Sequence, residues 1–437
     1  MRESLDFTIN NIPEFKEKLL AWLGKQKPAI YLDNNSEFKY GKQTTDYHSF
    51  DCLAATGSIE TLKVQTGQAF HQLKILHNKS KDWLFGHLSY DLKNELENLS
   101  STKPDYLHFP EIHFFRPKFI FILKGNLFQI LFLKKNNTHT LIRQIFDDIN
   151  NLEINNNSVQ RKNIYFSEKI SKNEYLEKLN EILAHIQHGD IYEINFCQEF
   201  YSENTRINPV NLYRRLKQVS PTPFSSYYNF DNNFCLTASP ERFIAKRGRK
   251  IISQPIKGTI RRGKTKSEDL KLIAQLKTDK KERAENIMIV DLVRNDLART
   301  ATFGSVRVEE LCGIYSFPQV HQMISTISSE LDKKYHFTDA IKNAFPMGSM
   351  TGAPKIRAME LIEKYESTKR GIYSGAIGYI DPNGDFDFNV VIRSLQYNKS
   401  RKYLSYIVGG AITSMSIPEK EYSECLLKAE AMLKAFK

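Results

Sequence analysis

The stretch SSYYNFDNNFCLTASPERFIAKRGRKIISQPIKGT, residues 225–259, predicts the fold class of this chain. It holds four short runs of strand-like residues, separated by the turn pairs Asp-Asn, Pro-Glu and Gly-Arg. Helical patterns flank it: a capping box at Ser171 opens one helix, and residues 277–298 have the spacing of another. Because strands come in clusters and helices are interspersed irregularly, the sequence predicts an α+β fold and not a regular βαβ barrel.

The composition is that of a folded protein. Of 437 residues 41% are hydrophobic and 12% aromatic, so a large core is available and disorder is excluded. There is no run of about 18 apolar residues, so we expect no membrane partner, and the N-terminus lacks the pattern of a secretory signal. The five cysteines are scattered without a CxxC pair, which argues against structural zinc and favours a reducing, cytoplasmic location.

The net charge of +12 indicates an anionic partner, either a nucleic acid or a small substrate. The densest basic stretch, residues 264–283, has acidic residues among the basic ones, as a solvated helix surface also does. A nucleic-acid binder would need an aromatic-basic platform or a known module. The sequence contains neither, so we expect no nucleic-acid partner.

The chain is long enough for two or three domain-sized units. KFIFILKGNLFQILFL, residues 118–133, predicts two strands around a turn at Gly125. The polar stretch at 150–163 predicts a linker or a long surface loop. We therefore expect an N-terminal lobe over residues 1–165 and a second domain over residues 166–437.

Acidic side chains recur at helical spacing in two places. Glu421, Glu424 and Lys428 share one face of the last helix, as either a solvated face with ion pairs or two carboxylates around a cation would require. Glu285 shares a face with Ile289 and other apolar residues, so it needs a partner unless it lies at the edge of the core. Mg²⁺ is one such partner, because it uses one or two protein carboxylates with waters and an anionic substrate.

Three further places are candidates for binding or catalysis. GSMTGAPK, residues 348–355, leads into a helix whose free N–H groups could bind an anion or form an ordinary cap. Gly409 and Gly410 allow a ligand to approach a strand closely. Lys257 in QPIKGT is either a surface turn residue or a nucleophile, which would have to be neutral.

Together these segments resemble the chorismate-utilising enzymes, which include anthranilate synthase component I, aminodeoxychorismate synthase component I, isochorismate synthase and salicylate synthase. The resemblance covers residues from about 170 to 437 and is weaker before them, mainly at GHLSYDLKNELE (86–97). The matching segments are GDIYEINF (189–196), SPERF (239–243), PIKGT (255–259), AENIMIVDLVRND (284–296), VHQMIS (320–325), GSMTGAPKIRAMELI (348–362), YSGAIGYI (373–380), FNVVIRSL (388–395), IVGGAIT (407–413) and EYSECLLKAE (421–430).

The resemblance implies two large β-sheets packed as a sandwich, with helices outside and the active site in a central cleft. It implies a lobe of the anthranilate synthase component I type over residues 1–165 and a chorismate-binding catalytic domain over 166–437. It also implies that Glu285 and Glu424 hold Mg²⁺, with Glu421 close by. The implied substrate-binding residues are Arg393 and Tyr373 at the enolpyruvyl carboxylate, the backbone at Gly409 and Gly410, and Thr351, Gly352 and Lys428 along the same cleft.

Two positions distinguish the members of this family. Isochorismate and salicylate synthases have a water-activating lysine at the position of Glu193, where ammonia-using synthases usually have glutamine. Anthranilate synthases read PIAGT where this chain has Lys257, and a lysine there marks the aminodeoxychorismate synthases. The resemblance therefore implies conversion of chorismate and ammonia to 4-amino-4-deoxychorismate, for 4-aminobenzoate and folate. The alternative is anthranilate synthase component I.

In that reaction the resemblance gives Lys257 the role of a covalent nucleophile at C2 of chorismate, with Glu241 as general acid for the departing C4 hydroxyl. Mg²⁺ would help to keep the lysine neutral. His321 either orients the C4 hydroxyl or is a buried structural histidine. None of the cysteines lies in a Gly-x-Cys-x-Gly setting, so we expect a separate glutamine amidotransferase subunit to supply the ammonia.

Overall fold

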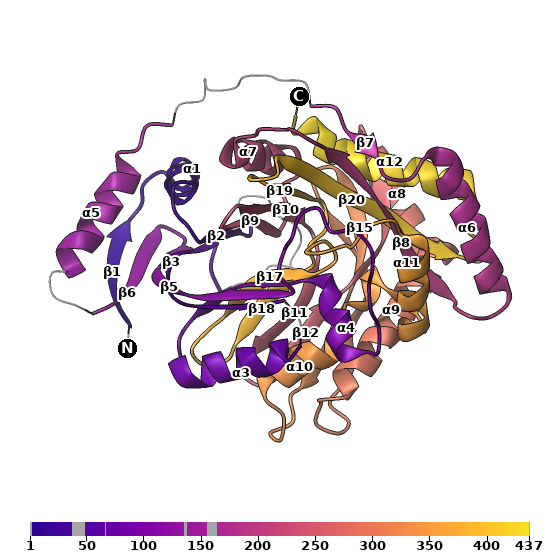
Figure 1. The fold of residues 1–437 in the computed structure, drawn as a ribbon, viewed down its shortest axis with the longest axis horizontal. Coiled ribbons are helices and arrows are strands. Elements are labelled where there is room, and N and C mark those ends of the chain that lie inside the picture. Colours follow the sequence, from indigo (N-terminus) through magenta and orange to yellow (C-terminus); the bar gives the residue numbers. More distant parts are fainter. Residues whose placement is uncertain (1, 37–48, 66, 135–137, 155–163, 437) are drawn as a thin grey trace.

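The computed structural model describes residues 2–36, 49–65, 67–134, 138–154 and 164–436 (Figure 1). The strands are β1 (Arg2–Thr8), β2 (Ala29–Asp33), β3 (Cys52–Val64), β4 (Leu84–Leu88), β5 (Ile112–Lys124), β6 (Leu127–Leu133), β7 (Ser167–Glu168), β8 (Glu193–Ser202), β9 (Phe224–Phe230), β10 (Asn233–Ser239), β11 (Arg242–Arg247), β12 (Lys250–Gln254), β13 (Ile256–Arg261), β14 (Arg307–Ser316), β15 (Val320–Glu330), β16 (Gly352–Ala353), β17 (Ala376–Ile380), β18 (Phe386–Asn389), β19 (Ser394–Asn398) and β20 (Tyr403–Thr413). The helices are α1 (Ile12–Leu23), α3 (Ala69–Ser80), α4 (Lys93–Leu96), α5 (Thr138–Asn150), α6 (Lys172–Gln187), α7 (Pro209–Val219), α8 (Lys266–Thr278), α9 (Lys280–Ala298), α10 (Phe337–Ala344), α11 (Lys355–Tyr365) and α12 (Pro418–Lys434), with 3₁₀ turns η1 (Tyr90–Leu92) and η2 (Gly348–Met350).

The strands form one hydrogen-bonded network with two branches, which meet at the long strands β3 and β5. One branch runs from β3 through β2, β9, β10, β19 and β20 to β8. The other runs from β5 through β4, β17, β18, β11 and β12 to β15, which also pairs with β13 and β14. Residues of both branches share one apolar core, for example Ile30 with Ile377 and Tyr379. The two branches therefore form the two layers of a sandwich, and the predicted α+β fold is confirmed.

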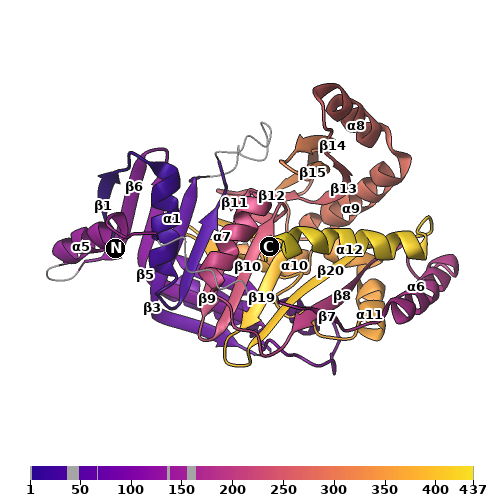
Figure 2. The same ribbon diagram turned by 90° about the horizontal axis from the view of Figure 1, so that it is seen from above.

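Helices cover the outer faces of both layers (Figures 1 and 2). Helices α1, α5, α7 and α12 pack on the layer that contains β9, β10, β19 and β20. Helices α3, α9 and α10 pack on the layer that contains β11, β12 and β18. Helices α6 and α11 pack around β8 near its N-terminal end, together with α12. Among the described helices none is both long and apolar enough to span a bilayer.

The strands predicted at 118–133 are β5 and β6, and the turn between them has Gly125 at φ 57°. The prediction of a single helix over residues 277–298 is wrong at its start, because α8 ends at Thr278 and α9 begins at Lys280. The side chain of Asp279 accepts a hydrogen bond from the Glu282 N–H at 3.0 Å, so it caps the second helix.

The predicted boundary at residue 165 stays a prediction. Strand β2 pairs with β9 and β4 pairs with β17, so the first part of the chain shares its sheets with the second. Residues 155–163 of the predicted linker lie outside the described residues.

Candidate active site

The site begins with a buried ion pair that joins the two layers. Lys257 of β13 donates through Nζ to Oε1 of Glu193 at the start of β8, at 2.6 Å. Lys257 is 8% exposed and Glu193 is 1% exposed. The register of β13 against β15 shifts between Ile256 and Thr259, and Gly258 has φ 95°, so the strand is irregular where it carries Lys257. The Asn286 side chain on α9 donates to the Lys257 carbonyl at 3.2 Å and holds this irregular segment in place.

In the chain without a substrate, the charges around Lys257 keep its amine protonated. Burial is the largest single influence and by itself would lower the pKa of Lys257, but the carboxylates of Glu193, Glu285 and Glu241 together outweigh it, so that the pKa is raised. The neutral amine expected for a nucleophile is therefore not the resting form of Lys257. A proton acceptor is needed before this lysine can attack a substrate.

Glu241 lies in the turn between β10 and β11, as expected for a residue that faces Lys257. Its Oε1 accepts a hydrogen bond from Ser349 Oγ at 2.5 Å. Burial raises the pKa of Glu241 to about 7, although Ser349 and Lys257 oppose the rise. A carboxyl group with a pKa near neutrality can donate a proton at physiological pH, which suits the predicted role of general acid.

Arg393 supplies a partly buried cation near Glu241. Burial lowers the pKa of Arg393 to about 10, with Glu241 opposing the fall, and the residue has φ 48°. Across the described ranges no carboxylate lies within 4 Å of its guanidinium. A guanidinium in this state is suited to bind an anion such as a substrate carboxylate.

Tyr373, the other residue predicted at that carboxylate, is buried between α11 and β17. Its hydroxyl lies 3.8 Å from Cys197 Sγ on β8. No described contact joins Tyr373 to Arg393, so their shared role stays a prediction.

The three predicted metal carboxylates lie on two facing helices, with lysines between them. Lys281 Nζ lies 3.8 Å from Glu285 Oε1 and 3.5 Å from Glu421 Oε1, while Lys428 Nζ lies 2.9 Å from Glu424 Oε1. Burial raises the pKa of Glu285 to about 7. Over the described residues, no group of three or more His, Cys, Asp or Glu side chains is close enough to hold a metal ion.

The donor set nevertheless suits Mg²⁺. Glu285 Oε1 is buried and accepts no hydrogen bond from any described residue. A Cβ at Gly410 would lie 3.5 Å from Glu421 Oε2 and 3.6 Å from Lys428 Nζ, so this glycine leaves space beside the acidic residues. Mg²⁺ prefers oxygen ligands and usually binds one or two protein carboxylates, with an anionic substrate and waters in the rest of its shell. Two glutamates are therefore enough.

The remaining predicted substrate residues line the same end of β8. Lys428 Nζ donates to the Gly409 carbonyl at 3.1 Å. The Thr351 hydroxyl donates to the Met347 carbonyl at 3.3 Å and is therefore occupied within its own loop. A Cβ at Gly352 would lie 2.1 Å from the Glu193 carbonyl oxygen, so only glycine lets β16 pack against β8 where Glu193 begins the strand.

His321 lies on β15 but is not directed at Lys257. Its Nδ1 is 2.8 Å from Ser316 Oγ and its Nε2 is 2.9 Å from Asp269 Oδ1 on α8. Both ring nitrogens are engaged and the side chain is fully buried. Of the two roles expected for His321, this geometry favours the structural one, and a part in proton transfer is not supported.

Sequence reasoning gave no role to three residues that the structure brings to the site. Ser349 holds Glu241, Asn286 holds the Lys257 backbone, and Lys281 lies between two carboxylates. Ser349 and Asn286 lie inside the segments that carry the family resemblance, GSMTGAPK and AENIMIVDLVRND, and that position was the available signal.

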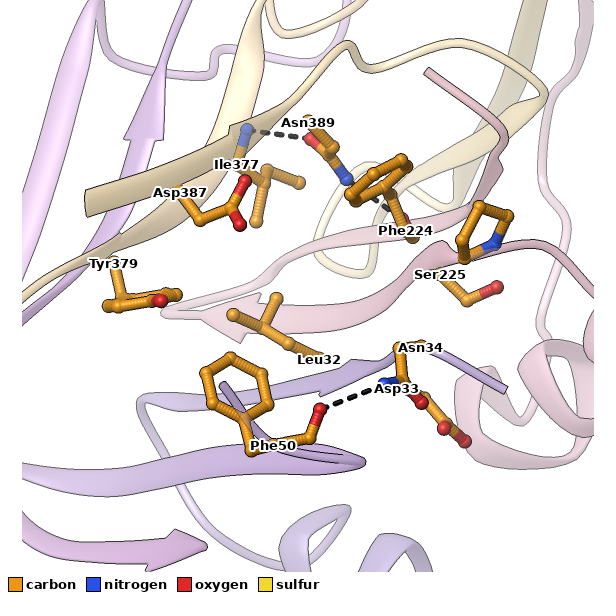
Figure 3. A pocket seen from close by; sticks show the side chains of 11 residues that line it. Leu32, Asp33, Asn34, Phe50, Phe224, Ser225, Ile377, Tyr379, Asp387 and Asn389 are labelled. Atoms are coloured by element: carbon orange, nitrogen blue, oxygen red, sulfur yellow. Dashed lines mark hydrogen bonds between the residues drawn. The ribbon is translucent and has the colours of Figure 1, made fainter. Parts of the chain in front are cut away.

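A cavity of about 40 Å³ lies between the layers, and none of the site residues named above lines it (Figure 3). It is lined by Leu32, Phe50, Tyr379 and neighbouring residues of β2, β9, β17 and β18. It is too small for a metabolite, because ligand pockets usually measure several hundred Å³.

Comparisons with known proteins show the family of this chain. The chain matches the chorismate binding enzyme family over residues 21–434, and it belongs to that family of enzymes. It is 33% identical to anthranilate synthase component 1 of Acetivibrio thermocellus over 370 residues, which cover 80% of this chain and 74% of that protein. It is 30% identical to aminodeoxychorismate synthase component 1 of Bacillus subtilis over 411 residues, which cover 91% and 83%. It is 40% identical to the chloroplastic aminodeoxychorismate synthase of Arabidopsis thaliana over 277 residues, which cover 63% of this chain and 30% of that protein.

Two solved structures share the fold. Anthranilate synthase component I from Streptococcus pneumoniae has a TM-score of 0.79 at 24% identity, covering 90% of this chain and 94% of its own. The menaquinone-specific isochorismate synthase MenF from Escherichia coli has a TM-score of 0.77 at 16% identity, covering 100% and 95%.

Proposed function

We propose that this chain is the synthase component that converts chorismate and ammonia to 4-amino-4-deoxychorismate, the precursor of 4-aminobenzoate for folate, in the cytoplasm. The observation that carries the proposal is the position of Lys257, a buried lysine surrounded by Glu193, Glu241 and Glu285. Overall similarity does not choose the product, because relatives named as aminodeoxychorismate synthases and as anthranilate synthases match to a similar degree.

The charged groups suit a substrate with two carboxylates. In this proposal Arg393 and Lys428 bind the carboxylate oxygens of the substrate, and Tyr373 adds a hydroxyl. With chorismate so held, Lys257 attacks C2 while Glu241 donates its proton to the C4 hydroxyl, which leaves as water. Ammonia then adds at C4 and expels the lysine, so the two displacements place the amino group at C4 with retention.

Mg²⁺ held by Glu285 and Glu424, with Glu421 close by, would supply positive charge to a substrate carboxylate. Lys281 and Lys428 lie beside these carboxylates in this structure. When Mg²⁺ binds, each lysine would either move away from its carboxylate or remain next to the ion.

The ammonia would come from glutamine through a separate amidotransferase subunit. Two relatives are named component 1, which is consistent with a second component in those systems. In this chain the five cysteines are buried, and burial raises the pKa of Cys197 to about 12, which does not suit a glutaminase nucleophile.

The test is product identification by mass spectrometry after incubation with chorismate, Mg²⁺ and ammonium chloride at alkaline pH. We expect 4-amino-4-deoxychorismate, which keeps the enolpyruvyl group, and no release of pyruvate. Glutamine alone should give no product. Anthranilate with stoichiometric pyruvate would show the alternative function, and turnover with glutamine would contradict the separate subunit.

A further inference from the structure

Glu193, which forms the ion pair with Lys257, has few hydrogen-bond donors around its carboxylate. Glu193 Oε1 accepts from Lys257 Nζ, while Glu193 Oε2 is buried and has no hydrogen-bond partner within the described part of the chain. Its side chain is 1% exposed. Among the described residues, Lys257 is therefore the one side chain that donates a hydrogen bond to this carboxylate.

This arrangement couples the protons of the two residues. If Lys257 gave its proton to water, a buried carboxylate without a counter-charge would remain, which is strongly unfavourable. If the proton moves to Glu193 instead, both groups become neutral together and no buried charge is left unpaired. The low-energy route to a neutral Lys257 therefore runs through Glu193.

We propose that Glu193 is a catalytic base that accepts the proton of Lys257 and so prepares its amine for attack. The inference rests on the proposed function, since it presupposes that Lys257 is the nucleophile. It gives a purpose to the glutamate at a position where glutamine or lysine is usual in the family.

The step balances as follows. One Nζ proton moves to Glu193 Oε1, and the freed lone pair forms the Nζ–C2 bond as the C4–O bond breaks and Glu241 protonates the departing hydroxyl. Ammonia then forms the N–C4 bond as the C2–Nζ bond breaks and the lysine leaves as a neutral amine. Glu193 returns its proton to Lys257, and the new C4 ammonium gives one proton to Glu241, which restores the starting state.

Other charged groups near Lys257 are less suited to this task. Glu241 is held by Ser349 and has to keep its proton for the leaving hydroxyl. Glu285 acts on Lys257 electrostatically but makes no described hydrogen bond to it, and it faces Lys281. Arg393, Glu282 and Glu424 are the other charged groups that act on these residues. Among the described residues, Glu193 alone accepts a hydrogen bond from Lys257 Nζ.

The decisive variant is Glu193→Gln, which keeps the shape of the side chain and removes the proton acceptor. The measurement is the rate at which chorismate forms an adduct on Lys257 in the full chain, with Mg²⁺ present and ammonia withheld, followed by rapid quench and peptide mass spectrometry from pH 6 to 10. We expect adduct formation at pH 7 to slow by at least about 100-fold, the usual contribution of a general base. Both proteins should lose rate as pH rises through about 7, where Glu241 loses its proton. The ratio of the variant's rate to the wild-type rate should climb with pH, while chorismate KM changes little.

Two further variants separate this role from a structural one. Glu199→Gln makes the same change at another buried position of β8, where Tyr403 donates to Glu199 at 2.9 Å, and it should leave the rate unchanged. Glu193→Asp retains an acceptor with a shorter reach, so it should restore part of the rate without the climb with pH. If Glu193→Gln does not fold, the Asp variant decides: a slow rate whose ratio to the wild-type rate climbs with pH would overturn the inference.

Adduct formation in Glu193→Gln as fast as in the wild type, or faster, would also overturn it and would make Glu193 a counter-ion only. Failure of the proposed function looks different. In that case the wild type itself would form no adduct on Lys257, and the amino group would appear at C2.

Discussion

Two buried lysine–carboxylate pairs in this molecule have similar distances and opposite surroundings. Lys16 on α1 donates to Asp33 on β2 at 2.8 Å, and Lys257 donates to Glu193 at 2.6 Å. Asp33 also accepts from Tyr31, the Asn35 N–H and, at 3.4 Å, Lys217, whereas Glu193 has one described donor. Asp33, with several hydrogen-bond donors, is suited to stabilise the fold. Glu193, with one donor, is suited to exchange a proton with that donor, Lys257.

The electrostatics agree with this difference. Burial alone would raise the pKa of Asp33, but Lys16 and Lys217 outweigh it and hold the pKa at about 2. Around Lys257 three carboxylates surround one lysine, and the pKa values of Glu241 and Glu285 are each raised to about 7 by burial. Groups whose pKa values lie near neutrality gather at the second pair, as they do at catalytic sites.

The largest effect is expected from Lys257→Ala. If Lys257 is the nucleophile, formation of the 4-amino product should fall by at least about 1,000-fold, and residual product should shift toward amination at C2. Lys257→Arg should also fail, because a guanidinium stays protonated and cannot attack. Steady-state kinetics with product identification decides. An Arg variant with near-normal kcat and 4-amino product would exclude the nucleophile and leave only an electrostatic contact.

Lys16→Met tests the other half of the comparison. The change keeps most of the side-chain volume but leaves Asp33 with less of its counter-charge, so the free energy of unfolding should fall by about 3 kcal/mol. Activity per folded molecule should stay the same, because this pair lies away from the site. Urea unfolding followed by fluorescence measures the loss. A change below about 1 kcal/mol would show that Lys217 alone suffices for Asp33.

Part of the fold and part of the candidate site could be predicted from the sequence. The strands over 225–259, the helix after Ser171 and the proximity of Glu241 to Lys257 follow from local patterns and from short separations along the chain. The contact between Lys257 and Glu193 does not, because the two residues are 64 positions apart on different layers. Alternation predicts which side chains share a face of a strand, but not which strands of two layers oppose one another.

The same limit explains His321. Asp269, which occupies one of its ring nitrogens, comes from a helix 52 positions earlier in the chain. The break between α8 and α9 was different, since Asp279 is a residue type favoured at helix N-caps and the signal was present.

Glu285→Gln and Glu424→Gln extend the comparison to two further carboxylates. Glu285 has a buried oxygen with no hydrogen-bond donor among the described residues, and Glu424 pairs with Lys428 at 2.9 Å. If these residues hold Mg²⁺, chorismate turnover should fall by at least about 100-fold in each variant and need more Mg²⁺. Thermal stability should change little or rise, because a buried charge is removed in Glu285→Gln. Glu430→Gln on the same helix as Glu424, where Glu430 forms an exposed pair with Lys434 at 3.3 Å, is the control and should have no effect. Unchanged Mg²⁺ dependence in both site variants would refute the assignment.

The smallest expected effect is the most specific one, and it concerns Ser349. If Glu241 is the general acid, kcat should fall as pH rises through about 7, because the carboxyl then loses the proton that it has to donate. Burial raises the pKa of Glu285 into the same range, so this falling limb of the pH–rate profile does not by itself identify the residue that titrates. The Ser349 hydrogen bond lowers the pKa of Glu241, and Ser349→Ala should therefore move the limb upward by about 0.7 of a pH unit, the equivalent of a hydrogen bond worth about 1 kcal/mol.

Stability gives an independent reading of the same proton. The pKa of Glu241 is higher in the folded chain than in the unfolded one, so its protonated form contributes stability that is complete below about pH 4 and is lost as pH rises through about 7. Ser349→Ala should extend that loss to higher pH by the same amount. Ser253→Ala, which removes a buried hydroxyl that donates to the Phe243 carbonyl at 2.7 Å, is the matched control and should shift neither profile. A limb that stays in place in Ser349→Ala would assign the titration to another carboxyl and remove the support that the pKa of Glu241 gives to its role as the acid.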